Sequence, residues 1–335
     1  MGFLIEVIKN EVSLMGNLLS IGEILIDFIP EQKGVALKDV ISFERVLGGA
    51  PANVAATVAK LGGNASLITK LGEDAFGDFL LEQLERSSVH TDKIFRTKEA
   101  NTGLAFVSLN KNGERDFSFY RKPSADLLLT DIEINKNWFN QGDILHFCSV
   151  DLVESPMKQA HIKAVQSAKA RGSLVSFDPN VRLPLWNSPK ECRETILKFI
   201  PMSHILKLSD EELEFITGID DEQKAIESLF TGDVKLVVFT KGSRGADIYV
   251  QNKKYSSKGY CVQVEDTTGA GDAFIGAFLY QLLKKKADQE SLVDIVNEYY
   301  KEILAFANAS GALTTTGKGA ISSLPSKKEI QLLIN

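Results

Sequence analysis

The sequence predicts an α/β fold, with a doubly wound, mostly parallel sheet flanked by helices and a small antiparallel β lid. The short strand-like segments in the middle of the chain are apolar throughout, and segments with helical spacing separate them. Such strands are typical of a parallel sheet that is buried on both faces. Period-two alternation of polar and apolar residues in two other segments predicts the lid.

The elements of the main domain follow one another along residues 15–335. The expected strands are 18–21, 24–28, 65–69, 143–147, 174–177, 205–208, 234–240 and 262–264. The expected helices are 52–61, 76–85, 155–170, 188–199, 210–217 and 273–283. Glycines such as Gly62 and Gly172 follow two of these helices and mark common helix ends. The alternation predicts a doubly wound domain.

The lid is expected from residues 30–46 and 100–121, which both alternate with period two. The second segment contains Asn112-Gly113 between two such runs, which is a strong hairpin signal. Binding sites of open α/β sheets lie at strand ends and need covering from water. We therefore expect a separate lid, with an edge hairpin of the main sheet as the alternative.

Composition narrows the range of partners. The chain has 335 residues, a net charge of −6 and no block of five basic residues, which argues against nucleic acid or an anionic membrane as a partner. Cys148, Cys192 and Cys261 are far apart, which favours a reducing cytoplasm. No apolar run reaches about 18 residues, so no transmembrane helix is expected. Residues 1–14 are a poor signal peptide and are expected to be an N-terminal extension.

The segment DTTGAGDAFIGAF, residues 266–278, places glycines directly before a helix-like run. Gly269 and Gly271 let backbone amides approach a ligand, and a helix N-terminus adds free N–H groups and partial positive charge. This arrangement predicts an anion hole suited to phosphate. Asp272 would repel phosphate, but it is well placed to take a proton from an attacking hydroxyl. Helix capping is the alternative role for Asp272.

A second motif, GGAPAN at residues 48–53, precedes another expected helix. Gly48 and Gly49 permit a close backbone approach, and Asn53 offers donors and acceptors to a hydroxyl-rich ligand. Upstream, GEILIDF places Asp27 at the end of a strand, where its carboxylate could accept two hydroxyl hydrogen bonds. The alternatives are a helix-start amide for Asn53 and a turn carboxylate for Asp27.

With these motifs, the sequence resembles the PfkB, or ribokinase-like, carbohydrate kinases, and within that family it is most similar to the fructokinases. GEILIDFIP, KLGEDAFGDFL, FYRKPSADLLL, FDPNVRLPLW and KLSDEELEFITG extend the resemblance from about residue 18 to 324. It implies ATP-dependent phosphorylation of fructose at the 6-hydroxyl. Two alternatives lie within the family, 2-keto-3-deoxygluconate kinase and aminoimidazole riboside kinase. A more distant one is a non-catalytic sugar or nucleotide sensor.

The resemblance also implies roles for individual residues. Asp272 would be the base, with Arg182 near the transferring phosphate and with an anion hole from Gly269, Ala270 and Gly271. The implied sugar-binding residues are Asp27, Gly48, Gly49, Asn53, Phe106, Phe119 and Arg121. The two phenylalanines would pack over the sugar. Arg121 shares a strand face with Phe119 by period two and could point inward.

On the nucleotide side the resemblance implies Lys207, Ser209, Glu212, Thr240, Gly242, Gly245 and Asn308. Glu212 would help to place Mg²⁺ and its waters, although Ser209 stands where the family motif has asparagine. Many family members need a monovalent cation, usually K⁺, for which oxygen ligands are suitable. Its implied ligands are Asp266, Thr268, Thr314, Gly319 and Ser323. By analogy, a homodimer formed through the lid is expected.

Overall fold

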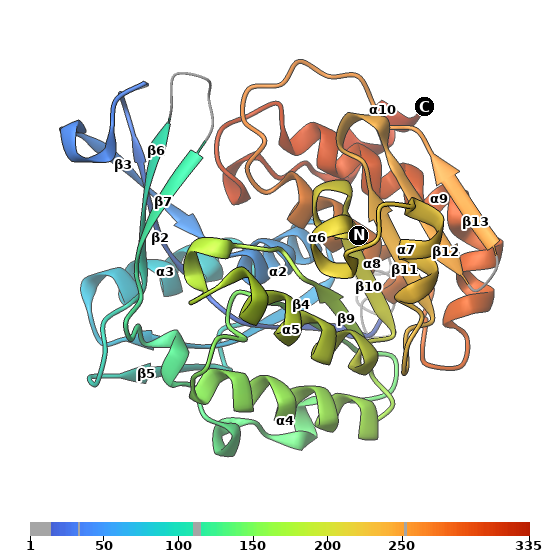
Figure 1. The fold of residues 1–335 in the computed structure, drawn as a ribbon, viewed down its shortest axis with the longest axis horizontal. Coiled ribbons are helices and arrows are strands. Elements are labelled where there is room, and N and C mark those ends of the chain that lie inside the picture. The colour runs from blue at the N-terminus through green and yellow to red at the C-terminus, as the bar shows by residue number, and fades with distance from the viewer. Residues whose placement is uncertain (1–14, 33, 110–114, 251–252) are drawn as a thin grey trace, which may run out of the picture.

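The computed structural model describes residues 15–32, 34–109, 115–250 and 253–335, and in this part of the chain it forms two sheets (Figure 1). The main sheet has nine described strands in the order β13-β12-β11-β10-β9-β8-β1-β4-β5. Their bounds are β1 Asn17–Ile21, β4 Asn64–Gly72, β5 Ile94–Thr97, β8 Ile144–Cys148, β9 Leu174–Asp178, β10 Ile205–Ser209, β11 Leu236–Thr240, β12 Ala246–Val250 and β13 Lys253–Ser257. The strands from β11 to β5 pair in parallel, which confirms the predicted main sheet.

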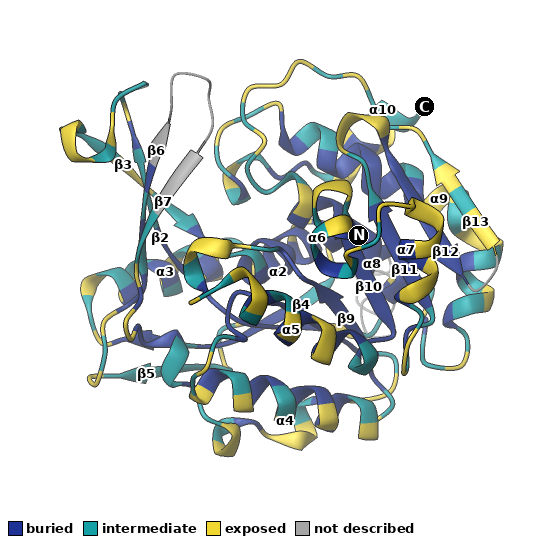
Figure 2. Ribbon diagram, in the orientation of Figure 1, coloured by how far each residue is buried: buried dark blue, intermediate teal, exposed yellow. Residues whose placement is uncertain are grey.

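Helices cover both faces of this sheet. Their bounds are α2 Ala50–Lys60, α3 Ala75–Arg86, α4 Pro156–Ala170, α5 Pro189–Phe199, α6 Asp210–Thr217, α7 Glu222–Ser228, α8 Ala270–Lys284, α9 Leu292–Thr314 and α10 Lys327–Ile334. Neighbouring residues of one strand enter different cores, since Ile144 belongs to the core that includes α2, α8 and α9, while Leu145 belongs to the core that includes α4 and α5. Figure 2 shows these strands buried and α4 and α5 exposed on their outer sides. Burial on both faces explains why the strands are apolar throughout.

The lid is the sheet β3-β2-β6-β7, which stands beside the body on the left of Figure 1. Its strands are β2 Leu25–Pro30, β3 Phe43–Gly48, β6 Leu104–Leu109 and β7 Arg115–Tyr120. The segment 24–28, expected in the main sheet, therefore belongs to the lid. Strand β2 also pairs in parallel with β6, whereas the other lid pairs are antiparallel. The Asn112-Gly113 turn and the extension 1–14 lie outside the described residues.

Two other expectations about the chain need correction or completion. Residues 262–264 form no strand, and Val264 is 57% exposed, because this stretch runs as an extended loop towards α8. Strands β12 and β13 were not expected, and they extend the sheet antiparallel beyond β11. The helices α7, α9 and α10 were not expected either. Among the described helices, none is both long and apolar enough to span a lipid bilayer.

Candidate active site

The N-terminus of α8 is a turn that only glycine can make comfortably. Gly269 is the N-cap residue with φ 75°, in the left-handed region that favours glycine. A β-carbon at this position would lie 2.4 Å from the β-carbon of Ala320. The backbone therefore passes close to the C-terminal loop. The Ala270 N–H donates to the Thr267 carbonyl at 3.3 Å, and the start of a helix is a common place for an anion to bind.

Asp272 lies in the first turn of α8 and is buried. Asn53 Nδ2 donates a hydrogen bond to Asp272 Oδ2 at 2.8 Å, and Asn180 Nδ2 donates to Asp272 Oδ1 at 3.4 Å. Burial raises the pKa of Asp272, while the Asn53 hydrogen bond and the charges of Lys207 and Arg182 lower it. Neutral amides thus hold this carboxylate, and its pKa remains raised, so it can accept a proton.

Asn53 reaches Asp272 across 219 residues because α2 and α8 pack closely. A β-carbon at Gly276 would lie 2.6 Å from Thr57 Cβ, so glycine permits the approach. Gly276 is one helical turn beyond Asp272, and Thr57 is one turn beyond Asn53. The close contact therefore sets the distance between the two polar side chains.

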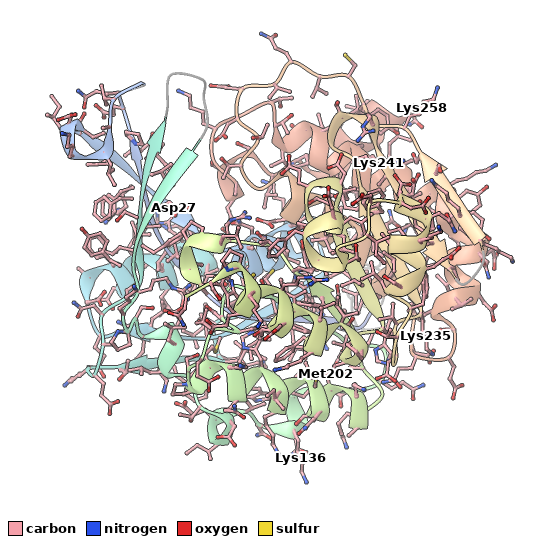
Figure 3. The ribbon with its side chains drawn as sticks, viewed as in Figure 1. Asp27, Lys136, Met202, Lys235, Lys241 and Lys258 are labelled. Carbon is pink, nitrogen blue, oxygen red and sulfur yellow. The ribbon has the colours of Figure 1, made fainter. Side chains whose placement is uncertain are left out.

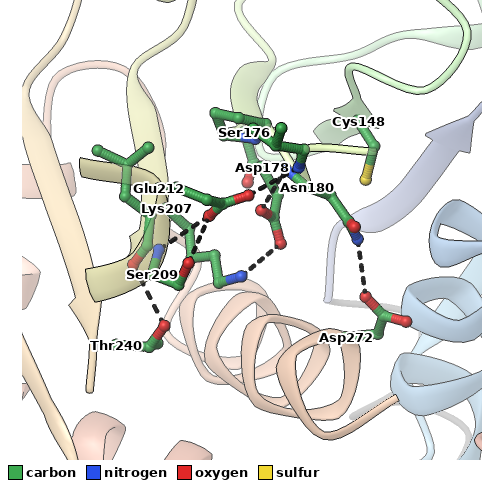
Figure 4. A network of polar contacts seen from close by, with 12 residues as sticks. Cys148, Ser176, Asp178, Asn180, Lys207, Ser209, Glu212, Thr240 and Asp272 are labelled. Carbon is green, nitrogen blue, oxygen red and sulfur yellow. Dashed lines mark hydrogen bonds and ion pairs between the residues drawn. The ribbon is translucent and has the colours of Figure 1, made fainter. Parts of the chain in front are cut away.

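The loop after β9 brings the other amide to Asp272 (Figure 4). Asn180 has φ 44°, a left-handed conformation that asparagine tolerates, and its backbone N–H donates to Asp178 Oδ1. Glu212 Oε1 accepts from the backbone N–H of Val181 at 2.7 Å and so ties this loop to α6. Arg182 is exposed, donates to the Val181 carbonyl, and lies close enough for its charge to lower the pKa of Asp272.

Lys207 projects from β10 towards the start of α8. Its Nζ is 2.9 Å from Asp178 Oδ2 and would be 3.5 Å from a β-carbon at Gly271. Burial raises the pKa of Asp178 to about 6 against the opposing effect of Lys207. Although burial opposes it, Asp178 and its acidic neighbours raise the pKa of Lys207, which stays protonated. A positive charge is thereby fixed beside the predicted anion hole.

Asp27 lies where the lid meets the body (Figure 3). A β-carbon at Gly48 would lie 2.2 Å from Asp27 Oδ2, so only glycine allows the carboxylate to face this strand end. Gly49, with φ 115°, is the N-cap of α2. Asn53 Oδ1 is buried without a hydrogen-bond partner among the described residues. Asp27 and Gly48 are therefore in contact, Gly49 begins α2, and Asn53 of the same helix contacts Asp272.

Phe106 faces the other way. It pairs with Phe28, next to Asp27, and the two rings stack at 4.8 Å between centroids, with Phe43 and Tyr120 edge-on. Because strand neighbours point to opposite faces, Phe106 lies on the face of the lid away from Asp27. The predicted orientation of Phe106 is wrong for a single chain. Phe119 pairs with Ala105, opposite Asp27, and so shares the Asp27 face.

Arg121 does point inward, as period two predicted, but it is not presented to a ligand. Its guanidinium is 4% exposed and forms ion pairs with Asp126 and Asp151. Asp126, Asp151 and Glu23 raise the pKa of Arg121, although burial opposes them, so it remains charged. The expected direct contact of Arg121 with a sugar is therefore not supported, because both ion pairs occupy this guanidinium.

The residues expected to bind the nucleotide lie on β10 and α6, at the end of β11 and just after it, and on α9. Thr240 ends β11, and Gly242 and Gly245 follow with φ 54° and 97°. A β-carbon at Gly245 would lie 2.1 Å from the Ser257 carbonyl oxygen, and Asn308 Nδ2 donates weakly to the Ser257 and Lys258 carbonyls. Lys241 and Lys258 lie across the molecule from Asp27 (Figure 3).

Ser209 and Glu212 cap the start of α6, a role that was not predicted. Ser209 is the N-cap of α6, and Glu212 Oε2 accepts from both its backbone N–H and its hydroxyl at 2.9 Å. With Val181 bonded to the other oxygen, Glu212 accepts three protein hydrogen bonds. A carboxylate offers about four acceptor positions, so room remains for about one further donor such as a water.

Three of the expected cation ligands are brought together. Asp266 Oδ1 accepts from the N–H and hydroxyl of Thr268, and Asp266 Oδ2 accepts from the Gly319 N–H at 3.1 Å. Ser323 bonds the Lys318 carbonyl in the same C-terminal loop. The hydroxyl of Thr314 instead donates to Ser310 O inside α9, so its side chain is already engaged.

Sequence reasoning missed Asp178 and Asn180, which connect Lys207 to Asp272 (Figure 4). Both lie in the FDPNVRLPLW segment, from which only Arg182 was selected. An Asp and an Asn immediately after an apolar strand, at the carboxyl edge of a parallel sheet, were the available signal.

Comparison with known proteins identifies the family. The model of the "pfkB family carbohydrate kinase" matches residues 15–327. Fructokinase-2 of Solanum habrochaites is 43% identical over 97% of this chain and 98% of its own length. The solved fructokinase of Xylella fastidiosa with bound ATP superposes with a TM-score of 0.87 at 35% identity, covering 95% of this chain and 98% of its own.

The fructokinase of Vibrio cholerae is also similar. Its structure with fructose, ADP and calcium has a TM-score of 0.84 at 32% identity, covering 96% of this chain and 99% of its own. A double mutant with fructose, ADP and potassium has the same score at 33% identity and the same coverage. On the family match and on these identities over nearly the whole chain, the protein belongs to the pfkB family of carbohydrate kinases.

Proposed function

We propose that the protein transfers the γ-phosphoryl group of ATP to the 6-hydroxyl of fructose. The observation that carries this proposal is a buried carboxylate, Asp272, in the first turn of a helix whose glycine-rich start faces a buried lysine. Relatives named fructokinase, including structures with ATP and with fructose and ADP, support the choice of substrates.

In the proposed reaction, Asp272 accepts the proton of the 6-hydroxyl as its oxygen attacks the γ-phosphorus. The new O–P bond forms while the bond to the ADP oxygen breaks, and the proton ends on the carboxylate. Burial, which raises the pKa of Asp272, favours this transfer. Asn53 and Asn180 hold the carboxylate in place with neutral donors.

The charge on the phosphoryl oxygens would be met by the amides of Gly269, Ala270 and Gly271 together with Lys207. Preorganised donors of this kind stabilise charge as it develops in the transition state. Arg182, which is exposed and whose charge lowers the pKa of Asp272, would approach the same oxygens. Asp178 keeps Lys207 aimed at the start of α8.

The sugar would lie between the lid and the start of α2. Asp27 would accept hydrogen bonds from two hydroxyls, and Asn53 Oδ1, unsatisfied among the described residues, would accept another. Phe119 would cover the sugar from the lid. Gly48 and Gly49 leave the space that a side chain would fill.

Mg²⁺ would be carried mainly by the phosphates of ATP. No cluster of three or more acidic, histidine or cysteine ligands occurs among the residues that the structure describes, and Mg²⁺ commonly uses one or two carboxylates, waters and phosphates. Glu212 can accept one water of such an ion. When bound, Mg²⁺ would neutralise phosphate charge.

K⁺ would sit beside Asp266, Thr268 and Gly319, with carbonyl oxygens of the C-terminal loop as further ligands. The potassium in the Vibrio cholerae structure supports this proposal. It predicts faster turnover in K⁺ than in Na⁺ at equal ionic strength. Equal rates in the two salts would contradict the proposed K⁺ site.

The substrate is tested with a panel of fructose, ribose, 2-keto-3-deoxygluconate and aminoimidazole riboside, each with Mg-ATP. Product analysis by NMR identifies the phosphorylated position. The proposal expects the highest kcat/KM for fructose and phosphate at position 6. A clear preference for another sugar would favour the alternative kinases, and no turnover with any of them would favour a sensor.

The lid also supports a proposed homodimer. Ile41 and Tyr120, in the lid segments, are 86% and 64% exposed although apolar. A second copy that covers them would reduce this exposure, and light scattering of the purified protein would detect the dimer. A cytoplasmic location stays a prediction from the scattered cysteines.

A further inference from the structure

A group of buried charged side chains lies where the lid joins the body. Glu23 precedes β2, and Arg121 follows β7, so each is next to the body end of a lid strand. Asp151 follows β8 of the main sheet, and Asp126 follows the lid in the chain. Glu23, Asp126, Asp151 and Arg121 are at most 5% exposed. We call these four residues the hinge cluster.

The hinge cluster touches the body end of every described lid strand. Arg121 Nη2 donates to both Asp126 and Asp151. A β-carbon at Gly103, just before β6, would lie 3.4 Å from Arg121 Cγ. Ala50, just after β3, donates its backbone N–H to Glu23 Oε1 at 3.1 Å.

Glu23 also holds the turn that carries the expected sugar residues. Its backbone oxygen would lie 2.5 Å from a β-carbon at Gly49, so the two backbone segments are in direct contact. On the same side, a β-carbon at Gly22 would lie 2.5 Å from Pro51 Cγ and 3.5 Å from Asp151 Oδ2. A displacement of Asp151 or Glu23 would therefore be transmitted directly to residues 48–51.

Charge within the hinge cluster is unequal. Among the described residues, one guanidinium faces three carboxylates, and Cys148 is a further titratable neighbour of Glu23. Burial raises the pKa of Asp151 to about 7, and burial together with Asp151 raises that of Glu23 well above its usual value. Three buried atoms, Glu23 Oε2, Asp151 Oδ2 and Arg121 Nε, lack a hydrogen-bond partner among the described residues. Burying such atoms costs stability, which suggests that the group serves a role other than stability.

We propose that the hinge cluster fixes the lid and the Gly48–Gly49 turn in the orientation that binds the sugar, with Glu23, Arg121 and Asp151 as positioning residues rather than sugar ligands. Each acts through a neighbour: Glu23 through the Ala50 amide, Asp151 through Arg121 and Gly22, and Arg121 through the ends of β6 and β7. The proposal deepens the proposed function, because it concerns how that sugar is held.

The first test compares Asp151→Asn with Asp143→Asn. Asp143 is also buried and precedes β8, whereas Asp151 follows it, so the two carboxylates cap opposite ends of one strand. Asp143 accepts from Asn17 and Asn140, far from the lid. We expect only Asp151→Asn to lower kcat/KM for the sugar, by about 10- to 100-fold through misplacement. Its KM for ATP should stay near that of the wild type.

The second test uses Glu23, in case Asp151→Asn fails to fold. Glu23→Ala removes the acceptor of the Ala50 amide, whereas Glu23→Gln keeps an oxygen there. We expect Glu23→Ala to raise the sugar KM and Glu23→Gln to restore it to within a few-fold of wild type, since a neutral oxygen suffices for one hydrogen bond. Equal sugar KM values for both Glu23 variants would overturn the proposal.

Hydrogen exchange separates this proposal from the proposed function, because it needs no turnover. In the full-length protein without ligands, Glu23→Ala and Asp151→Asn should speed amide exchange in residues 48–52 and in β2, β3, β6 and β7. Asp143→Asn should leave those amides as in the wild type. Unchanged lid exchange in the Glu23 and Asp151 variants would refute the hinge role, whatever sugar the wild type phosphorylates.

Discussion

The surroundings of Asp272 and the hinge cluster both bury carboxylates, yet they hold them in different ways. Asp272 receives two neutral amide donors, from Asn53 and Asn180. Asp126 and Asp151 instead share the permanent charge of Arg121. A neutral donor orients a carboxylate without adding a charge, whereas at Asp151 burial raises the pKa to about 7 although the charge of Arg121 lowers it. This difference in partners separates the carboxylate proposed as the base from the carboxylates proposed to hold the lid.

The largest expected effect is on Asp272. Asp272→Asn should lower kcat by about 10²- to 10⁴-fold, the usual contribution of a general base. Its melting temperature should be unchanged or higher. Because the folded pKa of Asp272 is raised, its stabilising contribution is present below the unfolded pKa and lost as pH rises through the folded pKa. At neutral pH the charge is a cost, which the amide removes.

A steady-state assay and a melting curve on the same preparation check this prediction. Asn53→Asp serves poorly as a control because it adds charge, so a surface change such as Glu82→Gln is used instead. Full activity in Asp272→Asn, or a large fall in its melting temperature, would show that Asp272 belongs with the structural carboxylates.

The next effect is on the stability of the hinge cluster. Arg121→Met should lower the free energy of unfolding by about 3–5 kcal/mol near pH 8, the usual cost of removing one partner of a buried ion pair. The loss should be smaller at pH 5. Burial raises the folded pKa of Asp151 to about 7, so the stability it contributes is present at acid pH, where it is neutral, and is lost as pH rises through 7. Arg121→Met therefore leaves a charged Asp151 without its partner at pH 8 but a neutral one at pH 5. Urea unfolding at both pH values measures the difference, and a pH-independent loss would contradict it.

A smaller effect tests the neutral donors at Asp272. The Asn53 hydrogen bond lowers the pKa of Asp272, so Asn53→Ala should raise that pKa by about one unit. The base must be deprotonated to act, and activity is therefore lost as pH falls through its pKa. The acid limb of the kcat/KM profile should move to higher pH in Asn53→Ala. An acid limb at the wild-type position would mean that another group limits the rate.

The smallest effect is expected on the nucleotide side. Asn308 makes only long hydrogen bonds, 3.3 and 3.4 Å, to two carbonyl groups. Asn308→Ala should raise the KM for ATP about two- to tenfold, as expected for one net hydrogen bond, without changing the sugar KM. Initial rates at varied ATP measure it. A larger change in the KM for the sugar than in the KM for ATP would contradict a role of Asn308 in nucleotide binding.

The site residues that could be predicted from the sequence are those that lie together in short motifs. Gly269 to Asp272 and Gly48 to Asn53 are local, because the glycines and the polar residue occupy one turn each. Apolar strands likewise predicted the main sheet. Residues 262–264 were wrongly expected to form a strand. Three alternating residues are enough to give the period-two pattern, but the pattern does not show whether a neighbouring strand is there to pair with them.

What could not be predicted depends on register and on distant pairing. Phe106 was assigned to the sugar face, but only the register with Phe28 shows which face it takes. Period two placed Arg121 inward, yet it gave no hint that Asp126 and Asp151 would pair with it. The position of Asp178 and Asn180 after an apolar strand was a visible signal, but their link between Lys207 and Asp272 follows only from the pairing of β9 with β10.

The most direct test of Asp272 as the base is a crystal structure of the wild-type protein with fructose and a non-hydrolysable ATP analogue. The account predicts a carboxylate oxygen of Asp272 about 2.6–3.2 Å from the 6-hydroxyl, or one water away, with the γ-phosphorus on the far side of that hydroxyl. Asp27 should contact other hydroxyls of the sugar. A 6-hydroxyl bound to Asp27, or lying beyond reach of Asp272, would contradict the account.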